Sequence, residues 1–257
     1  MNTRRDFMRG LSGLGAIIAT GQAPAAIVRS MVAVRGAMMG GKSGGGDLPY
    51  DAEVEYIETD GIDSYVDTGI IPVLVAEHDF SVMSVDFALQ EWRPDNTNFV
   101  CGARYNNTAT TTTFGCAAYD TSAHKIYFFR PTVSASSPLS QIDTYRHSVT
   151  MQNGLLVADG TGVSVTRISA TTQNATTNFC LGTSGVPSMH PSGVNQFAKA
   201  RFYSCKIVTG GDTVFEGMPV RKDGCGYIYD RVSGVNIGNA GTGTLGFGPD
   251  RVGGRHG

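Results

Sequence analysis

Charged side chains are scarce in this sequence. Asp, Glu, Lys and Arg together make up 16% of the 257 residues, below the roughly one quarter that is typical of soluble proteins. The 20 basic and 22 acidic residues nearly cancel, so the composition indicates no nucleic-acid partner and no strong attraction to an anionic membrane. Ser, Thr, Asn and Gly replace the missing charges. This polar, turn-rich composition favours an extracellular β-protein.

Several motifs of enzymes and metal sites are also missing. The five histidines are scattered and form no His-Glu-x-x-His zinc motif, and there is neither a Gly-x-Ser-x-Gly elbow nor a phosphate-binding loop. The five cysteines include no Cys-x-x-Cys pair, so neither a zinc ribbon nor a thioredoxin-type site is indicated. Most of them lie in apolar runs, which favours buried free thiols, with one or two disulfides as the alternative in an exported protein. We expect no cofactor and no bound metal.

The N-terminus resembles a twin-arginine export signal. Residues 3–9 read Thr-Arg-Arg-Asp-Phe-Met-Arg, close to the pattern S/T-R-R-x-F-x-K, with Arg9 in place of lysine. The following stretch, Leu11–Val28, is mildly apolar and too rich in glycine for a stable membrane helix. We therefore expect export to the periplasm, the cell surface or the medium, with no stable membrane span after signal removal. The alternative is an uncleaved basic N-terminus.

Composition divides the chain into four parts. The signal is expected at 1–28 and a Gly-rich linker at 29–48, because residues 40–46 read Gly-Gly-Lys-Ser-Gly-Gly-Gly, a flexible tether by composition. A single β-sandwich domain is expected at 49–250, followed by a disordered tail at 251–257.

Short β-prone runs separated by turn signals fill the expected domain. Apolar residues alternate with a period of two, and no segment after residue 48 keeps a helical stripe for three turns. Turn signals such as Asn153-Gly154, Asp159-Gly160 and Lys222-Asp223-Gly224 separate the runs. The pattern predicts an all-β fold of two packed antiparallel sheets. Strands are expected at 78–90, 113–118, 125–129, 145–151, 154–160, 163–168, 177–182, 198–208, 212–220 and 225–230.

Three blocks carry a resemblance to a known family. They are residues 55–72 (EYIETDGIDSYVDTGIIP), the pair FVCGARYNN and TTFGCAAYD, and the closing segments 200–207 and 219–243, the second of which begins with PVRKDG. All three blocks resemble modules of the concanavalin A-like lectin/glucanase superfamily. Such modules are found in gut-associated bacteria and their phages. The resemblance covers about residues 55–250 and implies a laminin-G-like jelly-roll β-sandwich. It concerns the fold and leaves the ligand open.

An acidic run at 53–58, Glu-Val-Glu-Tyr-Ile-Glu, is similar to the Glu-x-Asp-x-x-Glu motif of laminarinase-type glycoside hydrolases on the same sandwich. A retaining hydrolase needs its two carboxyl groups about 5–5.5 Å apart. Glu53 and Glu58 are five positions apart, so a regular strand would point them to opposite faces, and Glu55 replaces the central aspartate. We therefore expect solvent-facing acidic residues on an edge strand and no enzyme activity.

A second acidic cluster, Asp60, Asp63 and Asp67, has oxygen ligands that suit calcium. Its spacing matches no known calcium loop, and we interpret these residues as turn-forming aspartates. The Arg-Lys-Asp-Gly turn that begins at Arg221 is likewise interpreted as structural.

Sugar binding requires an exposed aromatic ring flanked by polar side chains. Trp92, the one tryptophan, lies between two expected strands, and Arg104, Tyr105 and Asn106 end the next strand. We predict a ligand-binding patch from these four residues, with rim packing as the alternative for Trp92. The leading hypothesis is an exported, non-catalytic recognition module for glycan or other cell-surface material. The alternatives are a laminarinase-type hydrolase and a structural or adhesive protein that recognises protein.

Overall fold

The computed structural model describes only part of the chain. The chain divides into two units, Met1–Gly46 and Asp47–Gly257, and every described residue belongs to the second. The expected signal and nearly all of the linker lie outside the described residues, as do 253–257 of the expected tail. The described ranges are 48–73, 81–91, 98–104, 113–119, 125–130, 133–136, 144–152, 155–164, 175–185 and 197–252.

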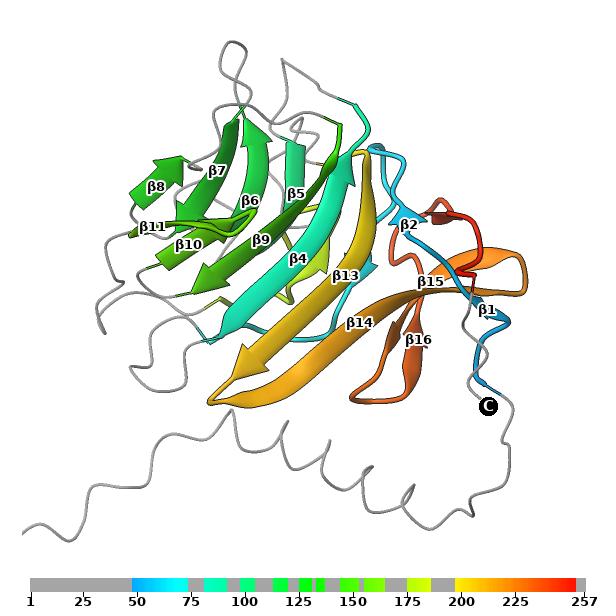
Figure 1. Ribbon diagram of the computed structural model, residues 1–257. Helices are drawn as coiled ribbons and strands as arrows, with labels where there is room; N and C mark the ends of the chain where they lie inside the picture. Colours follow the sequence, from blue (N-terminus) through cyan, green and yellow to red (C-terminus); the bar gives the residue numbers. More distant parts are fainter. Residues whose placement is uncertain are drawn as a thin grey trace, which may run out of the picture. The chain divides into compact units, whose positions relative to one another are not determined.

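Two antiparallel β-sheets and no helix make up the described residues (Figure 1). This confirms the predicted all-β, two-sheet jelly-roll sandwich. Because the described part has no helix, it also has no helix that is long and apolar enough to cross a membrane.

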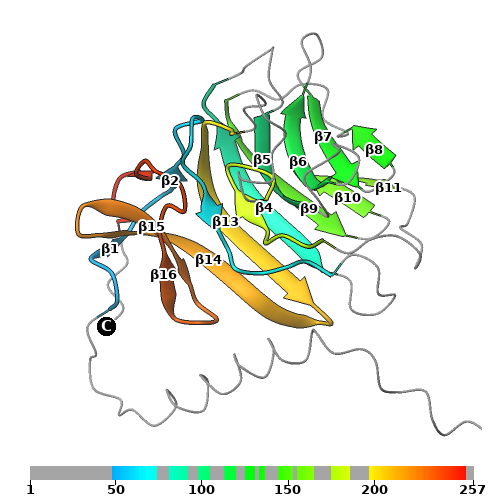
Figure 2. The ribbon, with the colours of Figure 1, turned by 180° about the vertical axis from the view of Figure 1, so that it is seen from behind.

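The larger sheet follows the order β11-β10-β9-β4-β13-β14-β15-β16, and Figure 2 shows it from the other side. Three short strands join it: β1 pairs with β14, and β2 pairs with both β13 and β17. The strands of this sheet are β1 (Ala52–Glu53), β2 (Ile57–Glu58), β4 (Val82–Leu89), β9 (Arg146–Gln152), β10 (Leu155–Ala158), β11 (Thr161–Ser164), β13 (Ala200–Thr209), β14 (Asp212–Lys222), β15 (Cys225–Asp230), β16 (Val235–Ile237) and β17 (Gly246–Phe247).

The smaller sheet follows the order β3-β12-β5-β6-β7-β8. Strand β12 lies between β3 and β5: its residue Cys180 is opposite Asp67 of β3 on one side and Gly102 of β5 on the other. Its strands are β3 (Val66–Asp67), β5 (Asn98–Arg104), β6 (Thr113–Tyr119), β7 (Lys125–Arg130), β8 (Val133–Ser136) and β12 (Cys180–Leu181).

Two-residue turns fix the register of the long hairpins. Asp223 and Gly224 both have positive φ angles, of 50° and 74°, and they join Lys222 to its partner Cys225. Asp159 and Gly160 join β10 to β11 in the same way. Positive φ at both central positions is the geometry of a type I′ turn, whose twist matches that of the flanking strands. The turns predicted from these dipeptides are confirmed.

The core lies between the two sheets. Alternate residues of the larger sheet point inward, including Phe87, Phe202 and Phe215, all fully buried. Phe99 and Phe179, in the smaller sheet and beside it, are fully buried as well. Apolar side chains of both sheets form one continuous cluster of buried residues. Complete burial of a side chain of this size contributes about 1.5–3 kcal/mol to folding, so this cluster is the main source of stability.

All five cysteines are unpaired in the structure. Cys101, Cys116, Cys180 and Cys205 are buried, and Cys225 is half-buried. Burial raises the pKa of the Cys116, Cys180 and Cys205 thiols well above the ordinary value, so these thiols stay protonated and unreactive at neutral pH. This agrees with the expectation of buried thiols that pack as small apolar side chains.

Candidate binding surface

Three of the four residues of the predicted ligand patch, Trp92, Tyr105 and Asn106, lie outside the described residues. The fourth, Arg104, ends β5 and is 0% exposed. Its side chain therefore lies inside the protein, where sequence reasoning had placed it on an exposed strand end. The patch as a whole stays a prediction.

A different surface, on the outer face of the larger sheet, is hollowed. The hollow has a volume of about 300 Å³ and is lined by residues from β9, β13, β14 and the segments after β15 and β17. We call it the outer hollow. Its lining residues are Arg146, Tyr203, Ser204, Cys205, Lys206, Glu216, Gly217, Met218, Arg231 and Arg251.

A β-bulge in β13 shapes this hollow. Phe202 lies opposite Phe87 of β4 and Ser204 lies opposite Asp86, the next residue of β4. Tyr203 is therefore an extra residue of β13 with no residue of β4 opposite it. A bulge bends its strand and re-aims the side chain of the inserted residue. Both Tyr203 and Ser204 are consequently half-exposed on the outer face, while Phe202 and Cys205 on either side remain buried in the core.

The Tyr203 ring contacts a cation and a second aromatic ring. The guanidinium of Arg146 lies 4.5 Å from the centre of the Tyr203 ring, and Arg146 also forms a 2.6 Å ion pair with Asp86. The Tyr56 ring meets Tyr203 edge-on, with 5.7 Å between the ring centres. Partial burial raises the pKa of Tyr203, so its hydroxyl is neutral at physiological pH and can donate a hydrogen bond.

The same row of side chains continues to Arg201. Its guanidinium lies 4.4 Å from the centre of the Tyr56 ring and forms a 2.7 Å ion pair with Glu58. The four side chains therefore follow the order Arg146, Tyr203, Tyr56, Arg201, with the two tyrosines between the two arginines. The stacking holds each ring and each guanidinium in a fixed orientation.

Among the described residues that line the outer hollow, cations outnumber anions. Arg251 donates to the carbonyl of Tyr203 at 3.4 Å, and Arg231 lies 3.5 Å from the carboxylate of Glu216. Lys206 lies directly across from Glu216 in the β13–β14 pairing. With Arg146 the lining therefore holds four cations, and Glu216 is its acidic residue. The geometry suits a polar, anionic ligand with hydroxyl groups.

The two outer glutamates of the acidic run at 53–58 make separate contacts. Glu58 lies in β2 and pairs with Arg201, whereas Glu53 lies in β1 and accepts a 3.4 Å hydrogen bond from Tyr50. One part of the sequence interpretation was wrong: β2 is not an edge strand, because β13 and β17 pair with it on its two sides.

Asp60 of the acidic cluster forms a turn, as expected. One carboxylate oxygen of Asp60 accepts hydrogen bonds from the N–H groups of Ile62, Asp63 and Ser64, at 2.7–3.1 Å. Partial burial alone would raise the pKa of Asp60, but these bonds together with the Ser64 hydroxyl lower it to about 2. The described residues contain no group of three or more acidic, His or Cys side chains that could hold a metal ion.

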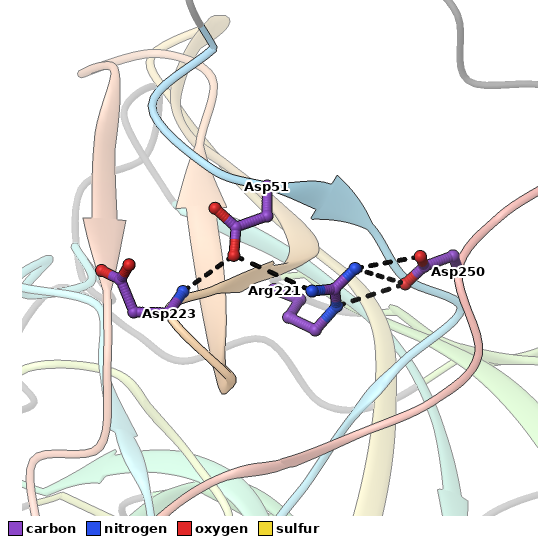
Figure 3. Close-up of polar contacts among 4 residues, drawn as sticks. All are labelled: Asp51, Arg221, Asp223 and Asp250. Carbon is purple, nitrogen blue, oxygen red and sulfur yellow. Dashed lines mark hydrogen bonds and ion pairs between the residues drawn. The ribbon is translucent and has the colours of Figure 1, made fainter.

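The Arg-Lys-Asp-Gly turn is structural and does more than close a hairpin (Figure 3). Arg221 forms ion pairs with Asp250 at 3.0 Å and with Asp51 at 3.8 Å. Asp51 in turn accepts a 2.9 Å hydrogen bond from the backbone N–H of Asp223. Residues from the two ends of the domain are thus held by one arginine of the β14–β15 hairpin, a contact that the sequence motif did not predict.

No protein-family model and no curated protein matches the sequence. Among solved structures, the chain is similar to the mouse laminin α1 chain, domains LG4–5, with a TM-score of 0.42 and 13% identity. That alignment covers 67% of this chain and 48% of the laminin chain, so it spans about half of its relative. A SAP-like pentraxin from Limulus polyphemus gives a TM-score of 0.42 at 9% identity, over 63% of this chain and 81% of the pentraxin.

A sialidase from Trypanosoma rangeli gives a TM-score of 0.39 at 11% identity, over 71% of this chain and 37% of the sialidase. Likenesses this remote carry no argument about ligand or activity. The outer hollow therefore has to be interpreted from its own residues.

Sequence reasoning missed the outer hollow. The signal was present in Ala-Arg-Phe-Tyr-Ser-Cys-Lys at 200–206, where two basic residues and a tyrosine alternate with apolar residues. What the sequence does not display is the bulge at Tyr203, which changes the phase of the alternation in the middle of the strand.

Proposed function

We propose that this domain is a non-catalytic recognition module that binds acidic glycans of a cell surface in the outer hollow. The observation that carries the proposal is the combination of the fixed Tyr203 ring with four cationic side chains around one hollow. A sugar ring packs its C–H face on an aromatic ring, and guanidinium groups bind carboxylates and sulfates through paired hydrogen bonds.

The size of the hollow also bears on the ligand. A volume of about 300 Å³ is at the lower end of the range for small-molecule pockets. It would hold one short part of a chain, and the rest of a polysaccharide would continue along the sheet beside Tyr56 and Arg201. Binding along a flat row of side chains is weak for each contact and gains strength from repetition.

Binding without hydrolysis is part of the proposal. Glycoside hydrolysis requires two carboxyl groups, about 5–5.5 Å apart in retaining enzymes and about 6.5–9.5 Å apart in inverting ones. Among the described residues of the lining, Glu216 is the one carboxyl group, so the second group that hydrolysis needs is not supplied by them. We therefore expect no turnover of laminarin or mixed-linkage β-glucan by the protein, and no difference in Glu53→Gln and Glu58→Gln variants. Turnover that both substitutions abolish would establish the hydrolase alternative.

A glycan array with the purified domain tests the ligand class. We expect signals on sulfated or carboxylated glycans that weaken as salt increases, because exposed charge pairs are screened within about 8 Å at physiological ionic strength. Binding to neutral glycans that is insensitive to salt would contradict the preference for acidic chains. Binding to cell-surface protein after removal of all glycans would favour the adhesive alternative.

Export is the second part of the proposal and rests on the Thr-Arg-Arg-Asp-Phe-Met-Arg motif alone. A recognition module for cell-surface glycans has to reach the outside of the cell, and the Gly-rich residues 40–46 would separate the folded domain from its N-terminal segment.

A further inference from the structure

Arg104 has hydrogen-bonding capacity that the described residues do not use. Its two terminal nitrogens, Nη1 and Nη2, are buried, and neither has a hydrogen-bond partner in the part of the chain that the structure describes. Buried polar groups in native proteins are nearly always paired, and an unpaired buried cation is costly. Arg104 therefore requires an explanation.

The position of the Arg104 side chain is well defined. Its backbone N–H donates to the Thr177 hydroxyl at 2.7 Å, and its backbone carbonyl accepts from the N–H groups of Thr176 and Thr177. The side-chain Nε donates to the carbonyl of Ser184 at 2.8 Å and to the Ser184 hydroxyl at 3.0 Å. Because Nε is occupied, the edge that carries Nη1 and Nη2 is the one left for a further partner.

Among the described residues, the groups that contact the Arg104 side chain carry no negative charge. Thr177, Ser184 and the Phe99 ring, whose centre lies 5.7 Å from the guanidinium carbon, are all uncharged. Burial lowers the pKa of Arg104 to about 10, so the side chain remains a cation at neutral pH. An aromatic ring face attracts a cation but leaves the N–H groups in the guanidinium plane without acceptors.

The sequence around this position is also free of acids. Residues 96–119, which contain Arg104, and residues 160–211, which contain Thr177 and Ser184, include no Asp and no Glu. These stretches contribute β5, β6, β12 and the segments that contact Arg104. These two stretches therefore supply no carboxylate that could pair with the guanidinium.

We propose that the Nη1–Nη2 edge of Arg104 binds an oxyanion, either a free inorganic anion or the acidic group of a larger ligand. Two parallel N–H groups on one edge of a guanidinium match the two oxygens of a carboxylate, sulfate or phosphate. A water molecule would satisfy hydrogen bonds but would leave the charge uncompensated. Arg104 belongs to the smaller sheet, so this site does not use the outer hollow.

Thermal unfolding of the full chain in sodium acetate, phosphate and sulfate, balanced to one ionic strength with sodium chloride, tests the proposal. An anion that binds the folded state raises the unfolding midpoint in a saturable way. We expect such a rise for at least one anion, and we expect Arg104→Lys to raise the half-saturating concentration at least about tenfold because lysine lacks the planar fork. Arg221→Lys, the same change at a half-exposed arginine that lies in neither proposed site, is the control and should respond as the unchanged chain does.

A parallel titration with glucuronate distinguishes the two sources of the oxyanion. If glucuronate half-saturates the site at a much lower concentration than acetate does, the site binds the acid group of a sugar. If the two half-saturating concentrations are equal, the site binds a free anion. Both results support an oxyanion site, and only their ligands differ.

A measurement on the unaltered chain covers the case in which Arg104→Lys fails to fold. In NMR spectra of the chain with 15N-labelled arginine, we expect one side-chain N–H signal whose hydrogen exchanges slowly with solvent. The chemical shift of that signal should change in a saturable way as the anion is added. The proposal is overturned if no slowly exchanging arginine signal responds to any of the anions. It is also overturned if the Arg104→Lys and Arg221→Lys variants have the same half-saturating concentration for every anion. Loss of glycan binding to the outer hollow would leave these readouts unchanged, so the two proposals fail separately.

Discussion

Arg221 and Asp250 form an ion pair, 3.0 Å between Nη2 and Oδ2, that holds the end of the domain to the β14–β15 hairpin. The same guanidinium reaches Asp51 near the start of the domain. Backbone hydrogen bonds run alongside, because the N–H of Asp51 donates to the carbonyl of Arg221 at 2.8 Å. Arg221 therefore joins segments that are far apart in the sequence.

Replacing Arg221 with Met should release both ends of the domain while the sandwich stays folded. Exposed ion pairs add little to global stability, so the effect is expected in local opening rather than in the unfolding midpoint. Hydrogen–deuterium exchange should become faster at residues 51–54 and 248–251 and remain unchanged in β4 and β13. Lys222→Gln, at the next position, serves as the control. Unaltered exchange at both ends would show that the backbone pairing alone holds them.

Asp60 should give the folded state a stability that depends on pH. Its pKa is lowered from 3.8 to about 2 in the folded protein, so the ionised carboxylate favours folding above about pH 4. That contribution is lost as the pH falls from about 4 towards 2. The Asp60→Asn variant keeps an oxygen that can accept the three N–H groups but carries no charge.

Urea unfolding of both proteins between pH 6 and pH 2 checks this prediction. The unchanged chain should be the more stable one at pH 6, and the difference should shrink on acidification. A difference that stays constant across this range would mean that the hydrogen bonds alone, without the charge, carry the effect.

Gly115 of β6 should tolerate no side chain. A Cβ atom at this position would meet the carbonyl of Cys101 and, at 2.6 Å, the Cα atom of Gly102, both in the backbone of β5. Backbone cannot move aside as a side chain can, and overpacking of this kind costs about 1–3 kcal/mol. Urea unfolding of Gly115→Ala should show a loss of that size. In the control Gly162→Ala, the nearest contact of the new atom is the end of the Leu155 side chain, at 3.3 Å, and the loss should be smaller.

How much of this fold the sequence predicts depends on the kind of contact. Strands β4, β13 and β15 were predicted near their observed bounds because buried and half-exposed residues alternate along them. The pairing of β2 with β13 and β17 was not predicted, since two-residue strands leave no periodic signal. The strand expected at 163–168 is observed at Thr161–Ser164, directly after its Asp-Gly turn, and 165–168 lie outside the described residues.

The candidate sites were harder to predict than the fold. Arginine is rarely fully buried, so Arg104 at a strand end was expected to be exposed. The outer hollow combines side chains from β9, β13, β14 and the chain near Arg251, and their approach depends on long-range pairing and on one bulge. A short stretch of sequence shows neither the long-range strand pairing nor the bulge that brings these side chains together.

Export should depend on the paired arginines. Changing Arg4 and Arg5 to lysine keeps the charge but removes the residues that a twin-arginine receptor recognises. We expect the double variant to accumulate as cytoplasmic precursor with a folded domain. Cell fractionation followed by immunoblotting measures this. Equal export of the double-lysine variant and the unchanged chain would contradict a twin-arginine route.

The most direct test of the central claim is the affinity for the strongest acidic glycan on the array, measured by titration calorimetry for Lys206→Gln and Lys222→Gln. Both variants lose one positive charge, and their positions are separated by about 20 Å along β14, at about 3.3 Å per residue. Lys206 lines the outer hollow and Lys222 lies beside the hairpin tip. We predict that Lys206→Gln weakens binding about three- to tenfold, the range for one charge-assisted contact at an exposed site, and that Lys222→Gln leaves it unchanged. Equal affinities for the two variants would contradict binding in the outer hollow.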